Sequence, residues 1–141
     1  MDPAKLRVAD LMTRDVATVR PGDKLSVAED VMRLGRIRHL PVVDEHDETK
    51  VVGMLSLRDL FRGSLANALG YGVRAQQKLL DMLTVKEAMT SPVITATPDT
   101  PLRDAARLML ERKLGSLPVL EGGRLVGILT ESDFVGLVAK G

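Results

Sequence analysis

The chain of 141 residues contains no cysteine and no tryptophan, and its only aromatic residues are two phenylalanines and one tyrosine. The absence of cysteine excludes disulfides, thiolate catalysis and zinc sites built from cysteine. With so few rings, the chain is not expected to offer a surface on which single-stranded bases stack. Hydrophobic residues make up 45% of the sequence, so the core is expected to be aliphatic.

Neither sign of charge dominates the sequence. Twenty lysines and arginines stand against 19 aspartates and glutamates, which gives a net charge of +1. Binding to duplex nucleic acid relies on an excess of basic residues, so no nucleic-acid partner is expected. The sequence also lacks an apolar run of membrane-spanning length, and its first residues lack the apolar stretch of a signal peptide. We therefore expect a soluble, cytoplasmic protein with no membrane partner.

The sequence does contain an internal repeat. Residues 8–42 match residues 85–119 at a constant offset of 77, with 12 identities in 35 positions, where chance would give about two or three. After a three-residue deletion the match resumes at an offset of 74. Two units of about fifty residues, each too small to bury much surface alone, are expected to pack about a pseudo-two-fold axis with a ligand along their seam. The identical pairs are Val8/Val85, Met12/Met89, Thr13/Thr90, Val16/Val93, Thr18/Thr95, Pro21/Pro98, Leu25/Leu102, Ala28/Ala105, Met32/Met109, Leu40/Leu117, Pro41/Pro118 and Val42/Val119, then Val52/Val126, Gly53/Gly127, Leu55/Leu129 and Asp59/Asp133.

Each repeat predicts the order strand, helix, strand, strand, helix, which makes the fold class α/β (α+β). The first strands are predicted at 16–19 and 93–96, where β-branched residues precede a proline turn. Asp23 and Thr100 can cap the helices that follow, and these helices carry apolar residues at helical spacing. The last two strands form a hairpin, which Gly122-Gly123 closes in the second repeat with a tight primed turn.

We divide the chain into a first repeat at 8–62, a helical connector at 63–84 and a second repeat at 85–139. The connector is too long for a bare loop, and the sequence from 74 to 80 has a helical pattern. Gly70-Tyr71-Gly72 is expected to break it into two pieces. We expect this connector to extend from the lobe toward a partner.

One pattern at the junction between the last strand and the last helix carries chemistry in both repeats. A glycine is followed after three residues by a hydroxyl side chain, and after three more by an aspartate. Two interpretations stay open. The hydroxyl and the carboxylate can form a capping box, or the helix N-terminus can bind a phosphate while the carboxylate accepts hydrogen bonds from a ribose. The glycine favours the second, because it lets another group approach the strand backbone. The residues are Gly53, Ser56 and Asp59, and Gly127, Thr130 and Asp133.

Together with MT-x(2)-V-x-T near the start and LPV in the middle of each repeat, this pattern resembles tandem cystathionine-β-synthase (CBS) domains, the Bateman module, in a stand-alone CBS-domain protein. The resemblance covers residues 8–59 and 85–134. It implies β-α-β-β-α repeats with two clefts and a regulatory module that binds adenosine nucleotides (AMP, ADP or ATP). S-adenosylmethionine or a similar adenosyl compound is an alternative ligand, and a scaffold without ligand is another. No cofactor is implied beyond such an adenosyl ligand.

The resemblance also implies roles for the paired residues. In each cleft the hydroxyl binds phosphate and the carboxylate binds ribose, and the pairs are Ser56 with Asp59 and Thr130 with Asp133. Thr18 and Thr95 would approach the base through their strand backbone, although an ordinary β-branched strand residue explains them equally well.

In the same resemblance, the residues just before the LPV strand line the clefts. These are Arg38 and His39 in the first repeat, and Gly115 and Ser116 in the second. Arg38 can pair with a phosphate through two hydrogen bonds, and His39 can add another donor. Both can also be solvated residues at a strand edge. If they do face a ligand, the basic cleft is expected to prefer more phosphates than the other.

An enzyme is not expected. The only histidines are His39 and His46, and the sequence shows no nucleophile elbow, no P-loop and no metal-ligand cluster. Two classes of function are left: a ligand-sensing module that regulates an unidentified protein partner in trans, or an interaction scaffold with vestigial clefts. In either case we expect a homodimer, because a second copy can cover the apolar helix faces of a two-lobed unit.

Overall fold

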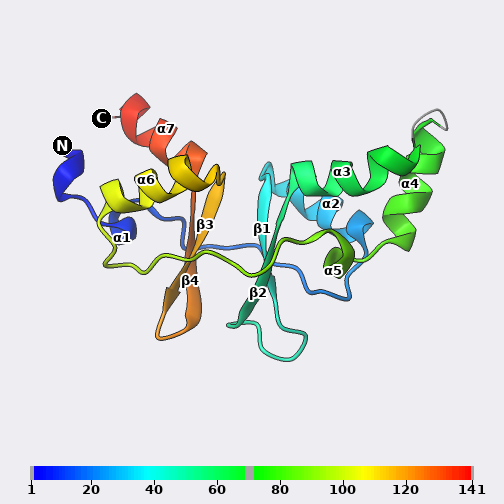
Figure 1. Cartoon of the computed structure of the whole chain (residues 1–141), viewed down its shortest axis with the longest axis horizontal. Coiled ribbons are helices and arrows are strands. Elements are labelled where there is room, and N and C mark those ends of the chain that lie inside the picture. Colours follow the sequence, from blue (N-terminus) through cyan, green and yellow to red (C-terminus); the bar gives the residue numbers. More distant parts are fainter. Residues whose placement is uncertain (1, 69–71, 141) are drawn as a thin grey trace. The chain divides into compact units, whose positions relative to one another are not determined.

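The computed structural model describes residues 2–68 and 72–140. The chain forms two compact units, whose elements are labelled in Figure 1. The unit that holds most of the first repeat, here called the repeat-1 unit, is Ala17–Val93. The repeat-2 unit is Met1–Val16 together with Ile94–Gly141. The segment that opens the chain therefore belongs with the second repeat.

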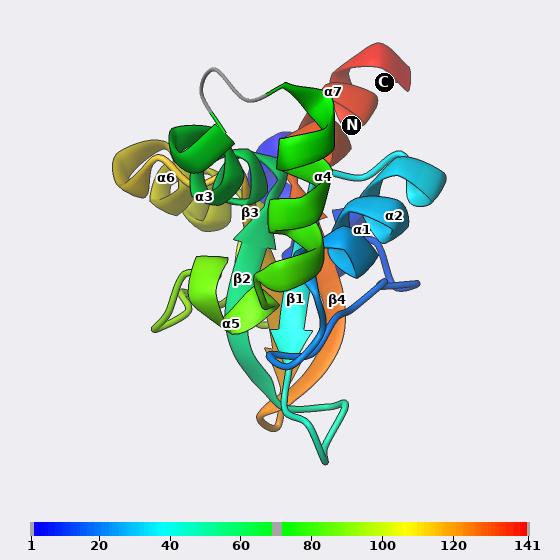
Figure 2. The same ribbon diagram turned by 90° about the vertical axis from the view of Figure 1, so that its right-hand side faces the viewer.

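The repeat-1 unit is built on an antiparallel hairpin with helices against it. Strand β1 pairs with β2, and His39 lies directly opposite Ser56. Helix α4 packs against α2 and α3 (Figure 2). The elements are α2 (Leu25–Gly35), β1 (His39–Val43), β2 (Val51–Ser56), α3 (Leu57–Ala68), α4 (Val73–Met82) and α5 (Val85–Ala88).

The repeat-2 unit has the same hairpin with its own helices. Strand β3 pairs antiparallel with β4, and Ser116 lies opposite Thr130. Gly122 and Gly123 have φ angles of 59° and 80°. A type I′ turn requires a positive φ at both of its central residues, so the predicted primed turn is confirmed. The elements are the 3-10 helix η1 (Pro3–Lys5), then α1 (Val8–Leu11), α6 (Leu102–Arg112), β3 (Ser116–Glu121), β4 (Arg124–Thr130) and α7 (Glu131–Lys140).

The segment around the start of each repeat packs on the other repeat. These two exchanged segments are residues 6–13 and residues 83–90. Thr13 and Ile128 exchange two backbone hydrogen bonds of 2.9 Å, and Thr90 and Met54 exchange two of 2.8 and 3.0 Å. Each pair of hydrogen bonds forms an antiparallel bridge to the second strand of a hairpin, from Thr13 to β4 and from Thr90 to β2. The boundaries at 62, 84 and 139 stay a prediction. The compact units do not coincide with the repeats, because each unit includes the first residues of the other repeat.

The predicted strands at 16–19 and 93–96 are much shorter than expected. Only Val19 and Ala96 pair, through parallel bridges to Val42 and Val119. In the first repeat a turn begins at the next residue, because the Asp23 backbone N–H donates to the Arg20 carbonyl at 3.0 Å. Pairing therefore stops after one residue.

The predicted helix caps were wrong by one residue. Helix α2 has Lys24 at its N-cap and α6 has Pro101, and neither makes a side-chain cap bond. Asp23 and Thr100 instead close the preceding turns by accepting backbone N–H groups at 2.8 and 3.0 Å. The first N–H groups of the helices bond the exchanged segments, Leu25 to the Leu83 carbonyl and Leu102 to the Leu6 carbonyl, so a side-chain cap is not needed there.

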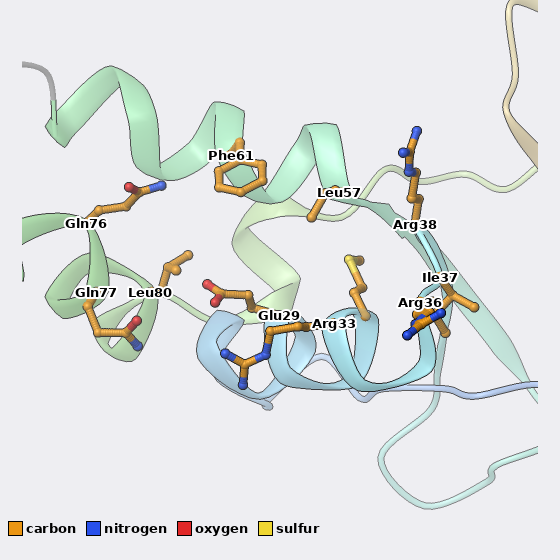
Figure 3. A pocket seen from close by; sticks show the side chains of 11 residues that line it. Glu29, Arg33, Arg36, Ile37, Arg38, Leu57, Phe61, Gln76, Gln77 and Leu80 are labelled. Carbon is orange, nitrogen blue, oxygen red and sulfur yellow. The ribbon is translucent and has the colours of Figure 1, made fainter. Parts of the chain in front are cut away.

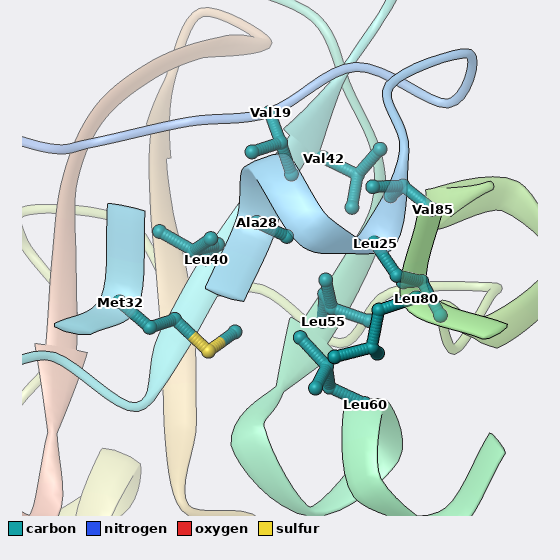
Figure 4. Close-up of a cluster of buried hydrophobic side chains, with 10 residues drawn as sticks. All are labelled: Val19, Leu25, Ala28, Met32, Leu40, Val42, Leu55, Leu60, Leu80 and Val85. Atoms are coloured by element: carbon teal, nitrogen blue, oxygen red, sulfur yellow. The ribbon is translucent and has the colours of Figure 1, made fainter. Parts of the chain in front are cut away.

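Both cores are aliphatic, with methionine, as the composition predicts. The repeat-1 core (Figure 4) takes residues from α2, both strands, α3, α4 and α5. The repeat-2 core takes them from α1, α6 and both strands, and partly buried residues of α7 pack against it. The repeat-1 cluster is Val19, Leu25, Ala28, Met32, Leu40, Val42, Leu55, Leu60, Leu80 and Val85. The repeat-2 cluster is Val8, Met12, Ala96, Leu102, Ala105, Met109, Leu117, Val119 and Leu129.

The connector differs from its prediction in where it lies. The helix predicted around residues 74–80 is confirmed as α4, but α4 packs back onto its own unit and does not extend from it, because Leu80 is buried in the repeat-1 core. Of the predicted break, Gly70 and Tyr71 lie outside the described residues, and Gly72 is the N-cap of α4. Within the described chain, every helix is too short or too polar to cross a membrane.

Candidate functional site

The first candidate pair lies where β2 meets α3. The Asp59 Oδ2 atom accepts a hydrogen bond from the Ser56 backbone N–H at 2.9 Å, and Ser56 Oγ accepts one from the Asp59 backbone N–H at 3.0 Å. These reciprocal bonds form the capping box that the spacing predicts. Both residues are half-buried, so their outer atoms stay accessible to a ligand.

The second pair, where β4 meets α7, is arranged differently. Asp133 Oδ2 accepts from the Thr130 backbone N–H at 2.8 Å and from the Thr130 hydroxyl at 3.2 Å. The Thr130 hydroxyl also lies 2.8 Å from the Ser132 hydroxyl. The other carboxylate oxygen, Oδ1, accepts from the Thr13 hydroxyl at 3.1 Å. Asp133 is therefore engaged through both oxygens.

The strand registers bring the other predicted residues to these junctions. His39 is the partner of Ser56 in the β1–β2 ladder, and Ser116 is the partner of Thr130 in the β3–β4 ladder. One residue earlier, the Arg38 carbonyl accepts from the backbone N–H of Leu57, the first residue of α3, at 2.8 Å. Arg38 itself is exposed, and it borders the same pocket as Leu57.

Gly115 takes the place of Arg38 in the repeat-2 unit. Its carbonyl accepts from the backbone N–H of Glu131 at 3.2 Å, and it brings no side chain. The two junctions therefore share a backbone frame and differ in charge: the repeat-1 junction carries a guanidinium, whereas the corresponding position of the repeat-2 junction is neutral.

The two predicted threonines lie in different places. Thr18 is half-buried and precedes Val19, whose backbone N–H donates to the Pro41 carbonyl at 3.2 Å beside the LPV strand. Thr95 is exposed and lines a separate hollow of about 340 Å³ along α6. Among the described residues that border this hollow, none belongs to the Thr130–Asp133 junction.

At both glycines of the motif another group does lie close to the strand backbone, but that group is a methionine side chain. A Cβ atom added at Gly53 would lie 2.6 Å from Met89 Sδ, and one added at Gly127 would lie 2.8 Å from Met12 Sδ. These methionines belong to the exchanged segments. The glycines are therefore explained by packing, and they no longer favour a ligand over a capping box.

The sequence interpretation missed Thr13, which contacts Asp133 from the exchanged segment. A signal was present, because Met12-Thr13 and Met89-Thr90 are identical in the two repeats. Their distance along the chain from the junction motif hid the contact. Within the described part of the chain, no group of three or more His, Cys, Asp or Glu residues is placed to hold a metal ion.

The model of the CBS domain family matches residues 8–66 and 85–140. The chain belongs to the CBS domain family. It carries the domain twice, as a CBS pair whose mixed helix-and-strand architecture matches solved CBS pairs. One of these is the CBS domain pair of protein MJ0100 in complex with 5′-methylthioadenosine and S-adenosyl-L-methionine. It is 30% identical with a TM-score of 0.76, and the alignment covers 96% of this chain and 97% of that one.

A second solved CBS pair is CBSX2, a protein of Arabidopsis thaliana, in complex with AMP. It is 29% identical with a TM-score of 0.75, over 95% of this chain and 96% of that one. Among curated proteins, the homoserine O-acetyltransferase of Methanohalobium evestigatum is 32% identical over 134 residues, which are 94% of this chain and 24% of that enzyme. The chain spans 24% to 43% of the length of several curated relatives that it matches. The match thus covers one part of these longer proteins.

Proposed function

We propose that the chain binds an adenosine nucleotide, AMP, ADP or ATP, at both strand–helix junctions, and that occupancy regulates a protein partner in trans. The observation that carries the proposal is the hydroxyl and carboxylate at the first turn of a helix in both units, in a family whose solved members include complexes with adenosyl ligands. The N-terminal end of each helix supplies positive potential for a phosphate. The carboxylate one turn on can accept the ribose hydroxyls.

The repeat-1 junction is the better site for a nucleotide with several phosphates. Arg38 lies beside the first turn of α3, where Gly115 in the other unit brings no charge. A guanidinium can pair with phosphate oxygens through two hydrogen bonds. We therefore expect the affinity of the repeat-1 junction to rise with the number of phosphates, and that of the repeat-2 junction to depend less on them.

Two alternatives have support of their own. An S-adenosylmethionine-type ligand is favoured by the complex of the MJ0100 pair and by the neutral Gly115. A scaffold without ligand is favoured by the capping bonds, which give the hydroxyl and the carboxylate of each pair a structural role without any ligand. The cytoplasmic location stays a prediction from the sequence.

A thermal-unfolding screen with AMP, ADP, ATP and S-adenosylmethionine separates these possibilities. A ligand at about 100 times its dissociation constant raises the free energy of unfolding by about 2.7 kcal/mol, which raises Tm by several degrees. We expect the adenosine nucleotides to do so, with guanosine nucleotides as the matched control. If none of the adenosyl compounds shifts Tm, the nucleotide proposal is wrong and the scaffold is favoured.

We also propose that the chain forms a homodimer through the face of the repeat-2 unit that α6 and α7 form. In the repeat-1 unit α4 covers α2 and α3, and a pocket of about 510 Å³ remains between the three helices (Figure 3). The equivalent groove between α6 and α7, of about 500 Å³, is lined within the described chain by these two helices and the residues just after α6, and by no third helix. The α6–α7 face consists of Leu110, Lys113, Glu131, Phe134, Val135 and Val138.

A second copy fits the α6–α7 face because the face is self-complementary. A two-fold axis places each residue of the patch against a different residue of the same patch. Lys113 and Glu131, opposite in charge, both border the groove, so each can meet the other across such an axis. The exposed apolar side chains between them gain burial.

The variant Leu110→Arg tests this dimer. Leu110 is 80% exposed on α6, and Leu34, 81% exposed on α2 of the other unit, provides the matched control. We expect the wild type and Leu34→Arg to sediment as dimers and Leu110→Arg as a monomer, because the new charge would be buried without a partner. A monomeric wild type, or a dimer that Leu110→Arg leaves intact, contradicts the proposed face.

A further inference from the structure

The first exchanged segment, residues 6–13, is held in the repeat-2 unit by backbone contacts. Thr13 forms two backbone hydrogen bonds with Ile128, and Val8 donates to the Thr100 carbonyl at 2.9 Å. Met12 packs on Gly127, the neighbour of Ile128 in β4. The position of Thr13 is therefore set by backbone contacts, and its hydroxyl donates to Asp133 Oδ1 at 3.1 Å from that fixed position.

The equivalent threonine of the other unit does not make this contact. Thr90 pairs with Met54 through its backbone, as Thr13 does with Ile128, and Met89 packs on Gly53. Yet among the described residues Asp59 accepts a hydrogen bond only through Oδ2, from Ser56. The two carboxylates thus differ by two hydrogen bonds, one from the Thr13 hydroxyl to Oδ1 and one from the Thr130 hydroxyl to Oδ2 of Asp133.

This difference decides which carboxylate oxygen a ribose can use. In both units Oδ2 is the oxygen of the helix cap, so Oδ1 is the atom left for a ligand. A carboxylate accepts about four hydrogen bonds in all. Asp133 already receives three, from Thr13 and twice from Thr130, whereas Asp59 receives one within the described chain. A ribose that donates both hydroxyls to Asp133 must displace a donor, and at Asp59 it displaces none.

We infer that Thr13 sets the affinity of the repeat-2 site by competing with the ribose for Asp133. The nucleotide consequently fills the Asp59 site first and the Asp133 site at higher concentration. This rests on the proposed function and adds the order of filling and the residue that fixes it. Because Thr13 belongs to the exchanged segment, occupancy of the Asp133 site removes the side-chain bond that this segment makes with the helix junction.

Calorimetric titration with AMP tests the inference on the full chain. The variant Asp59→Asn serves as the background, so that the remaining binding reports on Asp133. Adding Thr13→Val, which keeps the shape and removes the hydroxyl, is expected to tighten this binding about tenfold, the lower value for a hydrogen bond to a charged group. Thr13→Ser, which keeps the hydroxyl, is expected to restore the background affinity. Thr90→Val is the control from the other unit and is expected to leave the affinity unchanged.

The outcomes separate this inference from the proposed function. If the wild type binds AMP but Thr13→Val leaves the affinity of the background unchanged or weakens it, Thr13 does not compete and the inference is overturned. If Thr90→Val tightens binding as much as Thr13→Val, the effect does not come from the Asp133 contact and the inference is again overturned. If the wild type binds no adenosyl compound, the proposed function fails first and the inference falls with it.

Discussion

Replacing Leu80 with alanine is expected to lower the free energy of unfolding by about 2–5 kcal/mol, the cost of truncating a leucine in a packed core. Leu80 is 2% exposed, although it belongs to the connector. It lies among Leu25, Leu55 and Leu60 (Figure 4). Its truncation leaves a cavity where α4 meets the rest of the unit. Urea unfolding measures the effect as a lower midpoint at an unchanged slope.

Met82→Ala is the control for this experiment. Met82 lies on the same helix and is 75% exposed, so its truncation removes little packing and is expected to change stability by less than about 0.5 kcal/mol. A Leu80→Ala variant as stable as Met82→Ala would mean that α4 does not complete the repeat-1 core and that the connector is only loosely attached to it.

The sequence predicted those parts of the fold whose signals are local. The buried faces of α2 and α6, the hairpin turn at Gly122-Gly123 and the capping geometry of Ser56 with Asp59 all depend on residues within a few positions of one another. Periodicity and turn chemistry are sufficient for such features. The helix α4 was predicted for the same reason.

Features that depend on distant pairing could not be predicted in this way. The leucine stripe of α4 shows that the helix has an apolar face, but it does not say which surface that face covers. The packing of each exchanged segment on the other repeat left no local signal either. It also explains the wrong caps, because Leu83 and Leu6 supply the acceptors that Asp23 and Thr100 were expected to provide.

That the junctions bind a ligand stays a prediction; the sequence predicted one difference between them and missed a second. The duplication of hydroxyl and carboxylate made the two junctions look equivalent, apart from Arg38 and His39. The Thr13 contact adds a second difference, and both act in the same direction. Arg38 adds attraction for phosphate at the repeat-1 junction, and Thr13 adds competition for the ribose at the other. We therefore expect the repeat-1 junction to dominate nucleotide binding at low concentration.

The variant Asp59→Asn is accordingly expected to lower the affinity of the first binding event for AMP about 10- to 100-fold, because a hydrogen bond to a charged group contributes about 1.5–3 kcal/mol. Asparagine keeps an oxygen that can accept from the Ser56 backbone N–H, so the helix cap is expected to survive. Isothermal titration calorimetry measures the affinity, and thermal unfolding without ligand checks the fold. Asp81→Asn, an exposed aspartate on α4, is the matched control and is expected to bind as the wild type does.

A titration with 2′-deoxy-AMP identifies the contact that the carboxylate makes. If Asp59 accepts from the ribose 2′-hydroxyl, removing that hydroxyl weakens binding to the wild type and has little further effect on Asp59→Asn, because the two changes remove the same hydrogen bond. Additive losses would place the carboxylate elsewhere on the ligand. Wild-type affinity in Asp59→Asn and in Asp133→Asn alike would mean that both carboxylates only cap their helices, since a nucleotide would then bind without them.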